Sequence, residues 1–156
     1  MANARRLMLP RDLPKLVMAA DARPGETALA VAGPYAAAVL SAMGLKVTAQ
    51  EADAAVLEAV SGALAEAGVE GVTAPFDQPS GGDYDLIVSE AAVPVRPEAW
   101  LAALKVGGRL AVVERTGPTG KAVLYVKGAS GMSRRELFDA APPVLDEMAP
   151  EPAFAL

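Results

Sequence analysis

The sequence predicts an α/β fold with a doubly wound, mostly parallel sheet and an antiparallel C-terminal hairpin at one edge. Three observations support this prediction. Short apolar runs, typical of strands buried on both faces, alternate with longer segments whose apolar residues recur at helical spacing. Pro and Gly punctuate the boundaries between these segments. The last two strand-like segments are separated by a glycine turn alone, which favours antiparallel pairing.

Composition limits what the protein can do. Its 156 residues suit one domain with a real core, because 53% of them are hydrophobic. A net charge of −5 argues against nucleic acid as a partner, since phosphate binding needs a basic face. No apolar run approaches the length of a membrane span, and the N-terminus lacks a signal-peptide core followed by a cleavage site. We therefore expect a cytoplasmic protein.

The chain contains neither Cys nor His. Their absence removes disulfides, thiolate nucleophiles, histidine bases and the usual zinc ligands, so no metal site is expected. Any catalysis must depend on carboxylates, Lys, Tyr, hydroxyls, the backbone or a cofactor.

We expect three parts along the chain: a flexible or partly docked leader (1–10), the α/β domain (11–140) and a Pro-rich acidic tail (141–156) held by a few apolar contacts. The domain begins with a helix that Asp12 is expected to cap, with Pro14 in its first turn.

Residues 25–51 form the unit around which the rest is organised. A strand over 27–32 is followed by a Gly33-Pro34 turn, a helix over 35–43 and a second strand over 45–49. In nucleotide-binding units of this kind, the glycine turn lets the backbone approach the cofactor, and an acid about 20 residues later takes the ribose hydroxyls. Glu51 stands at that position. A single glycine is also an ordinary structural turn residue, and that alternative stays open.

The middle of the chain continues the alternation. Asp53 is the expected cap of a helix that runs to Ala67, and a weaker strand over 71–76 is followed by a polar loop. The fourth strand covers 84–88, with Ser89 and Glu90 at its carboxyl end.

The C-terminal part contains a helix, a strand and the hairpin. The helix has Pro97 in its first turn and ends at Gly107-Gly108, and a fifth strand follows over 109–114. Residues 121–127 and 133–139 form the expected antiparallel pair.

This order of elements resembles the Rossmann-like fold of class I S-adenosylmethionine-dependent methyltransferases, and more narrowly the protein-L-isoaspartate O-methyltransferase family. The matching stretches span nearly all of residues 11–156; they are RPGETALAV, YAAAVLSAM, YDLIVSEAAV, LKVGGRLAVV, GKAVLYVKG and LFDAAPP. The GGRLAVV element is shared by many methyltransferases, whereas the last two stretches narrow the resemblance to the protein-L-isoaspartate O-methyltransferase family.

The resemblance implies S-adenosylmethionine as the cofactor and Glu51 as the ribose-binding acid, but the sequence departs from the family elsewhere. The family's first-strand motif, D-V-G-x-G-x-G-Y, here has Ala30 at the acid and is two residues short around Gly33. The family's acid that reaches the adenine after the third strand is missing here, and Ala74-Pro75 lie in its neighbourhood. The family's catalytic hydroxyl lies in a Thr/Ser-rich segment that here reads LMLP (7–10), so no catalytic residue is assigned.

Three hypotheses follow. The first is a catalytically degenerate domain, a pseudoenzyme that acts by binding a protein; Leu7, Met8 and Leu9 are its candidate partner surface, unless they form a disordered end. The second is an active S-adenosylmethionine-dependent methyltransferase that acts on a protein carboxylate (isoaspartyl). Its cofactor-binding residues would be Gly33, Tyr35, Glu51 and Ser89, with Ser89 and Glu90 facing the substrate. The third is a domain that binds another small ligand in the crevice, or that assembles through the hairpin over 121–139.

Overall fold

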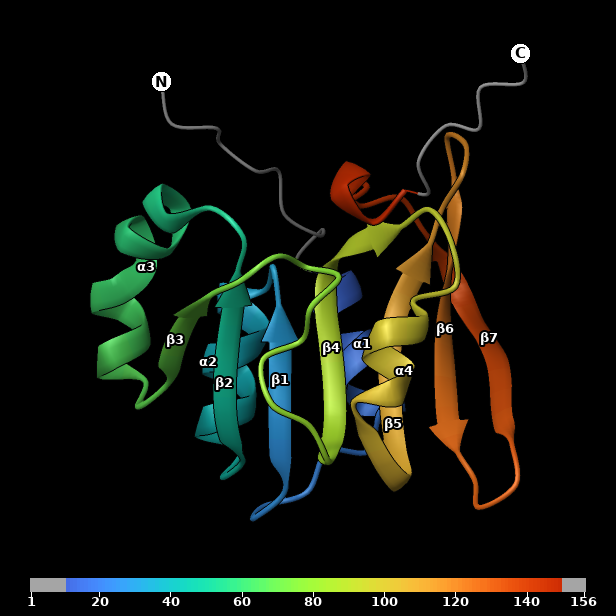
Figure 1. The fold of residues 1–156 in the computed structure, drawn as a ribbon, viewed down its shortest axis with the longest axis horizontal. Helices are drawn as coiled ribbons and strands as arrows, with labels where there is room; N and C mark the ends of the chain where they lie inside the picture. Colours follow the sequence, from blue (N-terminus) through green and yellow to red (C-terminus); the bar gives the residue numbers. More distant parts are fainter. Residues whose placement is uncertain (1–10, 150–156) are drawn as a thin grey trace.

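The computed structural model describes residues 11–149. Within this part of the chain, seven strands form one sheet in the order β3-β2-β1-β4-β5-β6-β7 (Figure 1). The strands are β1 (Thr27–Val31), β2 (Lys46–Glu51), β3 (Glu70–Thr73), β4 (Tyr84–Val93), β5 (Leu104–Glu114), β6 (Gly120–Lys127) and β7 (Met132–Ala140). β1 to β5 are parallel, and β6 and β7 form an antiparallel hairpin at the edge. The predicted fold class is confirmed.

Helices cover the sheet unequally (Figure 1). The helices of the described part are α1 (Asp12–Ala19), α2 (Pro34–Ala42), α3 (Ala54–Glu66), α4 (Glu98–Ala102) and the short 3₁₀ helix η1 (Asp146–Met148). α1, α2 and α3 pack on one face, where Leu16, Leu40 and Leu64 meet the inward side chains of the strands. The other face is covered by α4 and by the loop between β3 and β4, through Trp100 and Phe76.

The alternation of side chains along β1 explains the two cores. Ala28 and Ala30 face the α2 side, whereas Leu29 and Val31 face the α4 side, and all four are buried. A strand that is buried on both faces reads as the continuous apolar run seen in the sequence.

One predicted helix cap is confirmed, and two other helix boundaries differ from the sequence-based expectation. Asp53 caps α3 as predicted, because its Oδ1 accepts a hydrogen bond from the backbone N–H of Ala55 at 2.8 Å. Asp12 is wrong as a cap: it is the first residue of α1 and is buried, and Arg11 precedes it with no side-chain cap. α4 is only five residues long and ends well before Gly107.

The glycine pair instead shapes β5. The pairing of β4 with β5 shifts between Tyr84↔Leu104 and Leu86↔Arg109, so residues 105–108 make an irregular excursion inside the strand. Gly107 has a φ of +86°, and a methyl group on Gly108 would lie 2.6 Å from the carbonyl oxygen of Tyr84. These positions need glycine for backbone geometry, which sequence reasoning mistook for a helix end.

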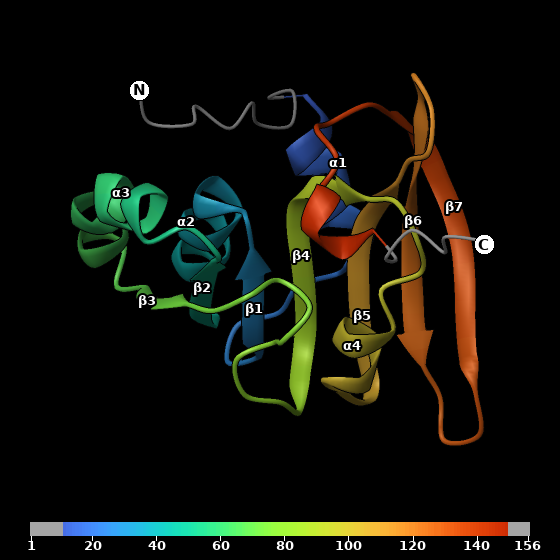
Figure 2. The same cartoon turned by 45° about the horizontal axis from the view of Figure 1, so that its top comes forward.

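The C-terminal part of the described chain lies near the carboxyl ends of the strands, where η1 sits beside β4 and β5 in both ribbon views (Figures 1 and 2). Val144 forms a bridge with Ala92 of β4, and Leu145 is buried. The expected leader 1–10, with Leu7, Met8 and Leu9, and the last residues of the expected tail (150–156) lie outside the described residues. Between residues 11 and 149, the helices are all too short or too polar to cross a membrane.

Candidate functional site

The carboxyl ends of β1 and β4 define the candidate site. The chain leaves β1 toward β2 on one side and later returns to β4 on the other, so the strand order reverses at this point. In open parallel sheets, ligands bind in the crevice at such a reversal. The sequence-predicted residues Gly33, Tyr35, Glu51, Ser89 and Glu90 come from the ends of β1, β2 and β4 that meet here.

Glu90 dominates this crevice. β4 continues to Val93, beyond the predicted end at residue 88, so Glu90 lies inside the strand and its side chain is only 2% exposed. Its Oε2 accepts hydrogen bonds from the backbone N–H groups of Tyr35, at 3.0 Å, and Ala36, at 3.1 Å. These are among the first N–H groups of α2, which have no partner within the helix. A carboxylate from β4 therefore occupies the N-terminus of α2.

Gly33 lies directly against this carboxylate. A methyl group at Gly33 would stand 2.9 Å from Oε2 and 3.3 Å from Cγ of Glu90. Glycine lets the turn and the Glu90 side chain come into contact, and a larger residue would have to displace that carboxylate. The preceding Ala32 has a φ of +48°, in the left-handed region that costs a non-glycine residue about 1 kcal/mol.

Burial changes the ionisation of Glu90. Desolvation raises the pKa of Glu90 above the usual carboxyl value, and the N–H groups of Ala36 and Tyr35 offset this shift only in part. Among the described residues, no cationic side chain forms an ion pair with Glu90. Within residues 11–149, this buried carboxyl group is held by two backbone N–H groups.

The other predicted residues each have contacts of their own within the described part of the chain. Glu51 is buried at the end of β2, where its Oε1 accepts a hydrogen bond from the N–H of Ala52 at 3.1 Å. The Ser89 hydroxyl donates to the carbonyl of Ala91 at 2.9 Å and is fully buried. The Tyr35 side chain is 61% exposed, and its backbone N–H is the part that faces the crevice. Gly33, the backbone of Tyr35 and Glu90 are brought together; Ser89 turns to its own strand.

Sequence reasoning missed Gln50, which is 2% exposed. Its side-chain N–H₂ donates to the carbonyls of Pro75, at 2.9 Å, and Gln78, at 3.1 Å, while its Oε1 accepts from the N–H of Ser80 at 2.8 Å. These bonds fasten the loop between β3 and β4. The signal was a Gln in a strand that is otherwise buried, because a buried amide must find partners.

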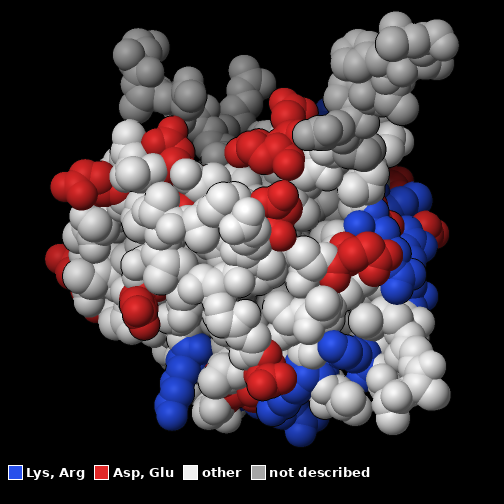
Figure 3. All heavy atoms as spheres, in the orientation of Figure 1, with Lys and Arg blue, Asp and Glu red and all other residues white. Residues whose placement is uncertain are grey.

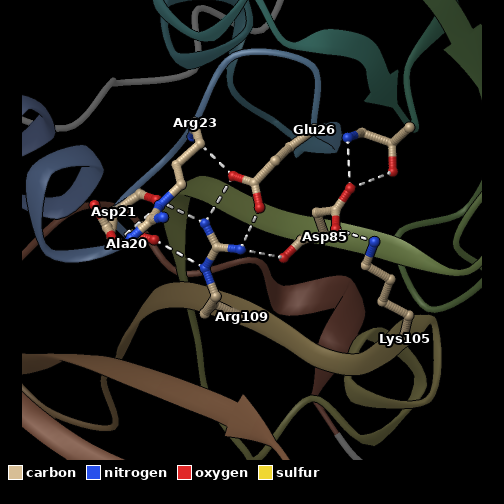
Figure 4. A network of polar contacts seen from close by, with 8 residues as sticks. Ala20, Asp21, Arg23, Glu26, Asp85, Lys105 and Arg109 are labelled. Carbon is tan, nitrogen blue, oxygen red and sulfur yellow. Dashed lines mark hydrogen bonds and ion pairs between the residues drawn. The ribbon is translucent and has the colours of Figure 1, made fainter.

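A second polar cluster lies at the opposite, amino-terminal ends of the strands (Figure 4). The Arg109 guanidinium forms two parallel hydrogen bonds with the Glu26 carboxylate, at 2.7 and 2.9 Å, and donates to the carbonyls of Ala20 and Asp21. The hydrogen bonds from Arg109 lower the pKa of Glu26 despite burial. We call this set, with Asp85 and Lys105, the Arg109 network.

Asp85 connects the Arg109 network to β1. Burial alone would raise the pKa of Asp85, but hydrogen bonds from Lys105 and from Thr27 lower it. The network ties the beginnings of β1, β4 and β5 to the end of α1, and its charges are matched. It is a structural joint.

Comparisons with known proteins agree with this description of the fold. No family model matches the chain. The chain is 35% identical over 133 residues to the protein-L-isoaspartate O-methyltransferase of Methylorubrum populi, an alignment that covers 81% of this chain and 62% of that protein. The chain therefore spans less than two thirds of the length of this curated relative.

Two solved structures share the fold. A protein-L-isoaspartate O-methyltransferase superposes with a TM-score of 0.72 at 22% identity and covers 87% of this chain and 47% of its own. A Plasmodium falciparum protein, in complex with S-adenosyl-L-homocysteine, superposes with a TM-score of 0.70 at 17% identity, over 89% of this chain and 71% of its own. The chain has the fold of the protein-L-isoaspartate O-methyltransferases, and the predicted resemblance is confirmed.

Proposed function

We propose that this relative of the protein-L-isoaspartate O-methyltransferases is a methyltransferase-like domain that does not use S-adenosylmethionine and that acts by binding another protein. The observation that carries the proposal is the position of Glu90, which fills the turn between β1 and α2.

The argument against the cofactor concerns both space and hydrogen bonding. Ligands of this topology use the N–H groups at the helix N-terminus after β1, which favour negative or polar groups. Here the N–H groups of Tyr35 and Ala36 already donate to Glu90, and Pro34 has no N–H to offer. A ligand would have to displace a buried carboxylate from its partners, at about 1–3 kcal/mol for each polar group left unpaired. These contacts support a turn that is closed to S-adenosylmethionine.

Support for a protein partner comes from the surface. A groove of about 530 Å³ opens beside the ends of β4 and β5 and is lined by both cationic and hydroxyl side chains. This groove stands apart from the turn that Glu90 fills, so binding there would not require the cofactor.

Ligand-induced stabilisation tests the proposal. The thermal midpoint of the purified chain is measured with and without S-adenosylmethionine and S-adenosylhomocysteine, with the Methylorubrum populi protein in the same buffer as positive control. A ligand at about 100 times its dissociation constant stabilises the folded state by roughly 2.7 kcal/mol, or several degrees for a chain of this size. We expect a shift for the control protein and none for this chain. A shift for this chain would overturn the proposal.

One observation favours the second candidate function, an active methyltransferase that acts on an isoaspartyl carboxylate with altered cofactor contacts. Glu51 lies at the carboxyl end of β2, beside β1, where the ribose-binding acid of the resemblance belongs. If this candidate is right, calorimetry detects S-adenosylmethionine binding to the wild-type chain and none to Glu51→Ala. Equal affinity of the two chains would remove Glu51 from the site.

A further inference from the structure

We infer that the groove beside the ends of β4 and β5 binds an extended acidic segment of a partner protein, with Arg115 as its anchor. This inference names the chemistry of the partner and therefore rests on the protein-binding function proposed above.

The groove is formed by three segments of the chain and adjoins a second cavity. Its walls come from the residues after β4 (94–96), the end of β5 (114–116) and the start of β6 (119–121). A second cavity of about 420 Å³ shares Pro94, Arg115 and Thr116 with it and continues toward Asp146. The two cavities adjoin at Arg115, so a ligand that follows both must be elongated.

The groove is cationic in an acidic protein. Its lining includes one carboxylate, Glu114, and four cations, which are Arg96, Arg115, Lys121 and Arg134. The chain as a whole carries a net charge of −5. Figure 3 shows Lys and Arg gathered, among a few carboxylates, on the side of the molecule where β6 and β7 lie. This local excess of positive charge complements an acidic ligand.

Three of the four cations already face a carboxylate of the chain. Arg134 pairs with Glu114 at 2.6 Å, Arg96 with Glu98 at 2.9 Å, and Lys121 pairs with Asp139. The Arg96 and Lys121 side chains are about half exposed, at 48% and 51%. Exposed ion pairs of this kind contribute little to stability, so an incoming carboxylate can exchange with them at low cost.

Arg115 differs from the other three. Its Nε donates to the carbonyl of Gly117 at 2.6 Å, and its Nη1 donates to the carbonyls of Ala141, at 3.1 Å, and Pro142, at 2.8 Å. Between residues 11 and 149, no carboxylate lies within 4 Å of this guanidinium. A guanidinium that neutral carbonyls hold in place keeps its charge for a ligand and loses little side-chain freedom on binding.

Tyr125 supplies a fixed floor for the groove. Arg96 lies over its ring at 5.4 Å, and its hydroxyl donates a hydrogen bond to Glu114. Burial and then Glu114 raise the pKa of Tyr125 to about 12, so the hydroxyl keeps its proton at neutral pH. The Glu114 carboxylate is thus engaged by Tyr125 and Arg134 and is not left to repel an acidic segment.

Fluorescence anisotropy tests the inference with a labelled peptide of about eight residues, roughly 27 Å when extended, in which Glu alternates with Ser. We expect the wild-type chain to bind it and Arg115→Ala to bind it about tenfold more weakly, the effect of one charge-assisted contact. Arg135→Ala is the matched control, because Arg135 is exposed on β7 and does not line the groove. This control is expected to bind as the wild type does.

A second variant guards against loss of fold, because Arg115→Ala also frees the carbonyls of residues 141 and 142. Lys121→Glu reverses a charge on the groove wall and is expected to weaken peptide binding more than Arg115→Ala does. Lys46→Glu, at the opposite end of the sheet, is expected to leave peptide binding unchanged. The thermal midpoint of each variant is recorded in parallel.

Three results would overturn the inference: no binding of the peptide to the wild-type chain, equal weakening by Arg115→Ala and Arg135→Ala, or competition by free glutarate as strong as that of the peptide. The last result would mean that the groove binds small anions only. None of these measurements contains S-adenosylmethionine. If the peptide does not bind and the cofactor does not bind either, only the assignment of the groove as the peptide-binding site is refuted. A thermal shift caused by the cofactor would instead refute only the proposed function.

Discussion

Two carboxylates at opposite ends of the same sheet have opposite environments. Glu26, in the Arg109 network, faces a guanidinium that binds both of its oxygens, and its pKa is lowered. Glu90 faces two backbone N–H groups, and its pKa is raised by burial. At the amino-terminal ends, charge is matched by charge and the strands are held together. At the carboxyl-terminal ends, an unmatched carboxyl group fills the place where this topology takes ligands.

The largest effect is expected when the Arg109 network, where the charges are matched, is disrupted. Arg109→Ala removes the guanidinium that donates to both oxygens of Glu26 and to the Asp85 carbonyl, and we expect the free energy of unfolding to fall by about 3 kcal/mol. Urea unfolding measures it, with Arg135→Ala as an exposed control that stays within about 0.5 kcal/mol of the wild type. A similar loss in both variants would show that the network does not act as a joint.

The next effect concerns the crevice. Glu90→Ala leaves the N–H groups of Tyr35 and Ala36 without their acceptor, which we expect to cost about 2 kcal/mol in the same urea assay. The variant also empties the space beside Gly33, so the cofactor assay is repeated on it. A stability equal to that of the wild type would mean that Glu90 does not hold the start of α2.

Opposite pH dependences sharpen the comparison. The folded pKa of Glu90 is raised above its ordinary value of 4.5, so its contribution to stability is fully present below about pH 4.5 and is lost as the pH rises through the folded pKa. The wild type should therefore lose stability relative to Glu90→Gln as the pH rises above about 4.5.

Glu26 should behave in the reverse way. Its folded pKa is lowered, so its contribution is present above about pH 4.5 and is lost as the pH falls through the folded pKa. On acidification, the wild type should lose its advantage over Glu26→Gln. Urea midpoints across the pH range decide both cases, and parallel curves for the two variants would contradict the assigned environments.

The smallest effect tests the turn itself. Ala32→Gly relieves the left-handed backbone but gives up a buried methyl group, so we expect its stability to change by less than about 1 kcal/mol. Ala59→Gly, at an exposed position inside α3, should lose about 1 kcal/mol. If Ala32→Gly lost more than Ala59→Gly, left-handed strain would not be stored at the turn.

The order of strands and helices could be predicted because each strand is a local apolar run and each helix a local period. Errors arose where a local pattern had two structural meanings. Gly107 and Gly108 suggested a helix end, but tertiary pairing uses them inside β5. Ser89 and Glu90 suggested a strand end, although Ala91, Ala92 and Val93 continue the strand.

The site was less predictable than the fold for a physical reason. The hydrogen bond between Glu90 and the N–H of Tyr35 joins residues 55 positions apart. Sequence spacing placed both residues near the same end of the sheet, but it could not say which side chain would turn inward. Glu51 was placed at the correct strand end, whereas Ser89 lies inside β4, and the assignment of both residues to a cofactor stays a prediction.

The Glu90 contact also bears on how the chain folds. β1, α2 and β2 form a compact local unit over residues 27–51, yet the acceptor for the first N–H groups of α2 arrives only with β4. A nascent chain that ends before residue 84 lacks this acceptor and also the second neighbour of β1. The start of α2 is therefore completed late, when a segment remote in sequence docks, and this makes the N-terminal half dependent on the rest of the domain for its final structure.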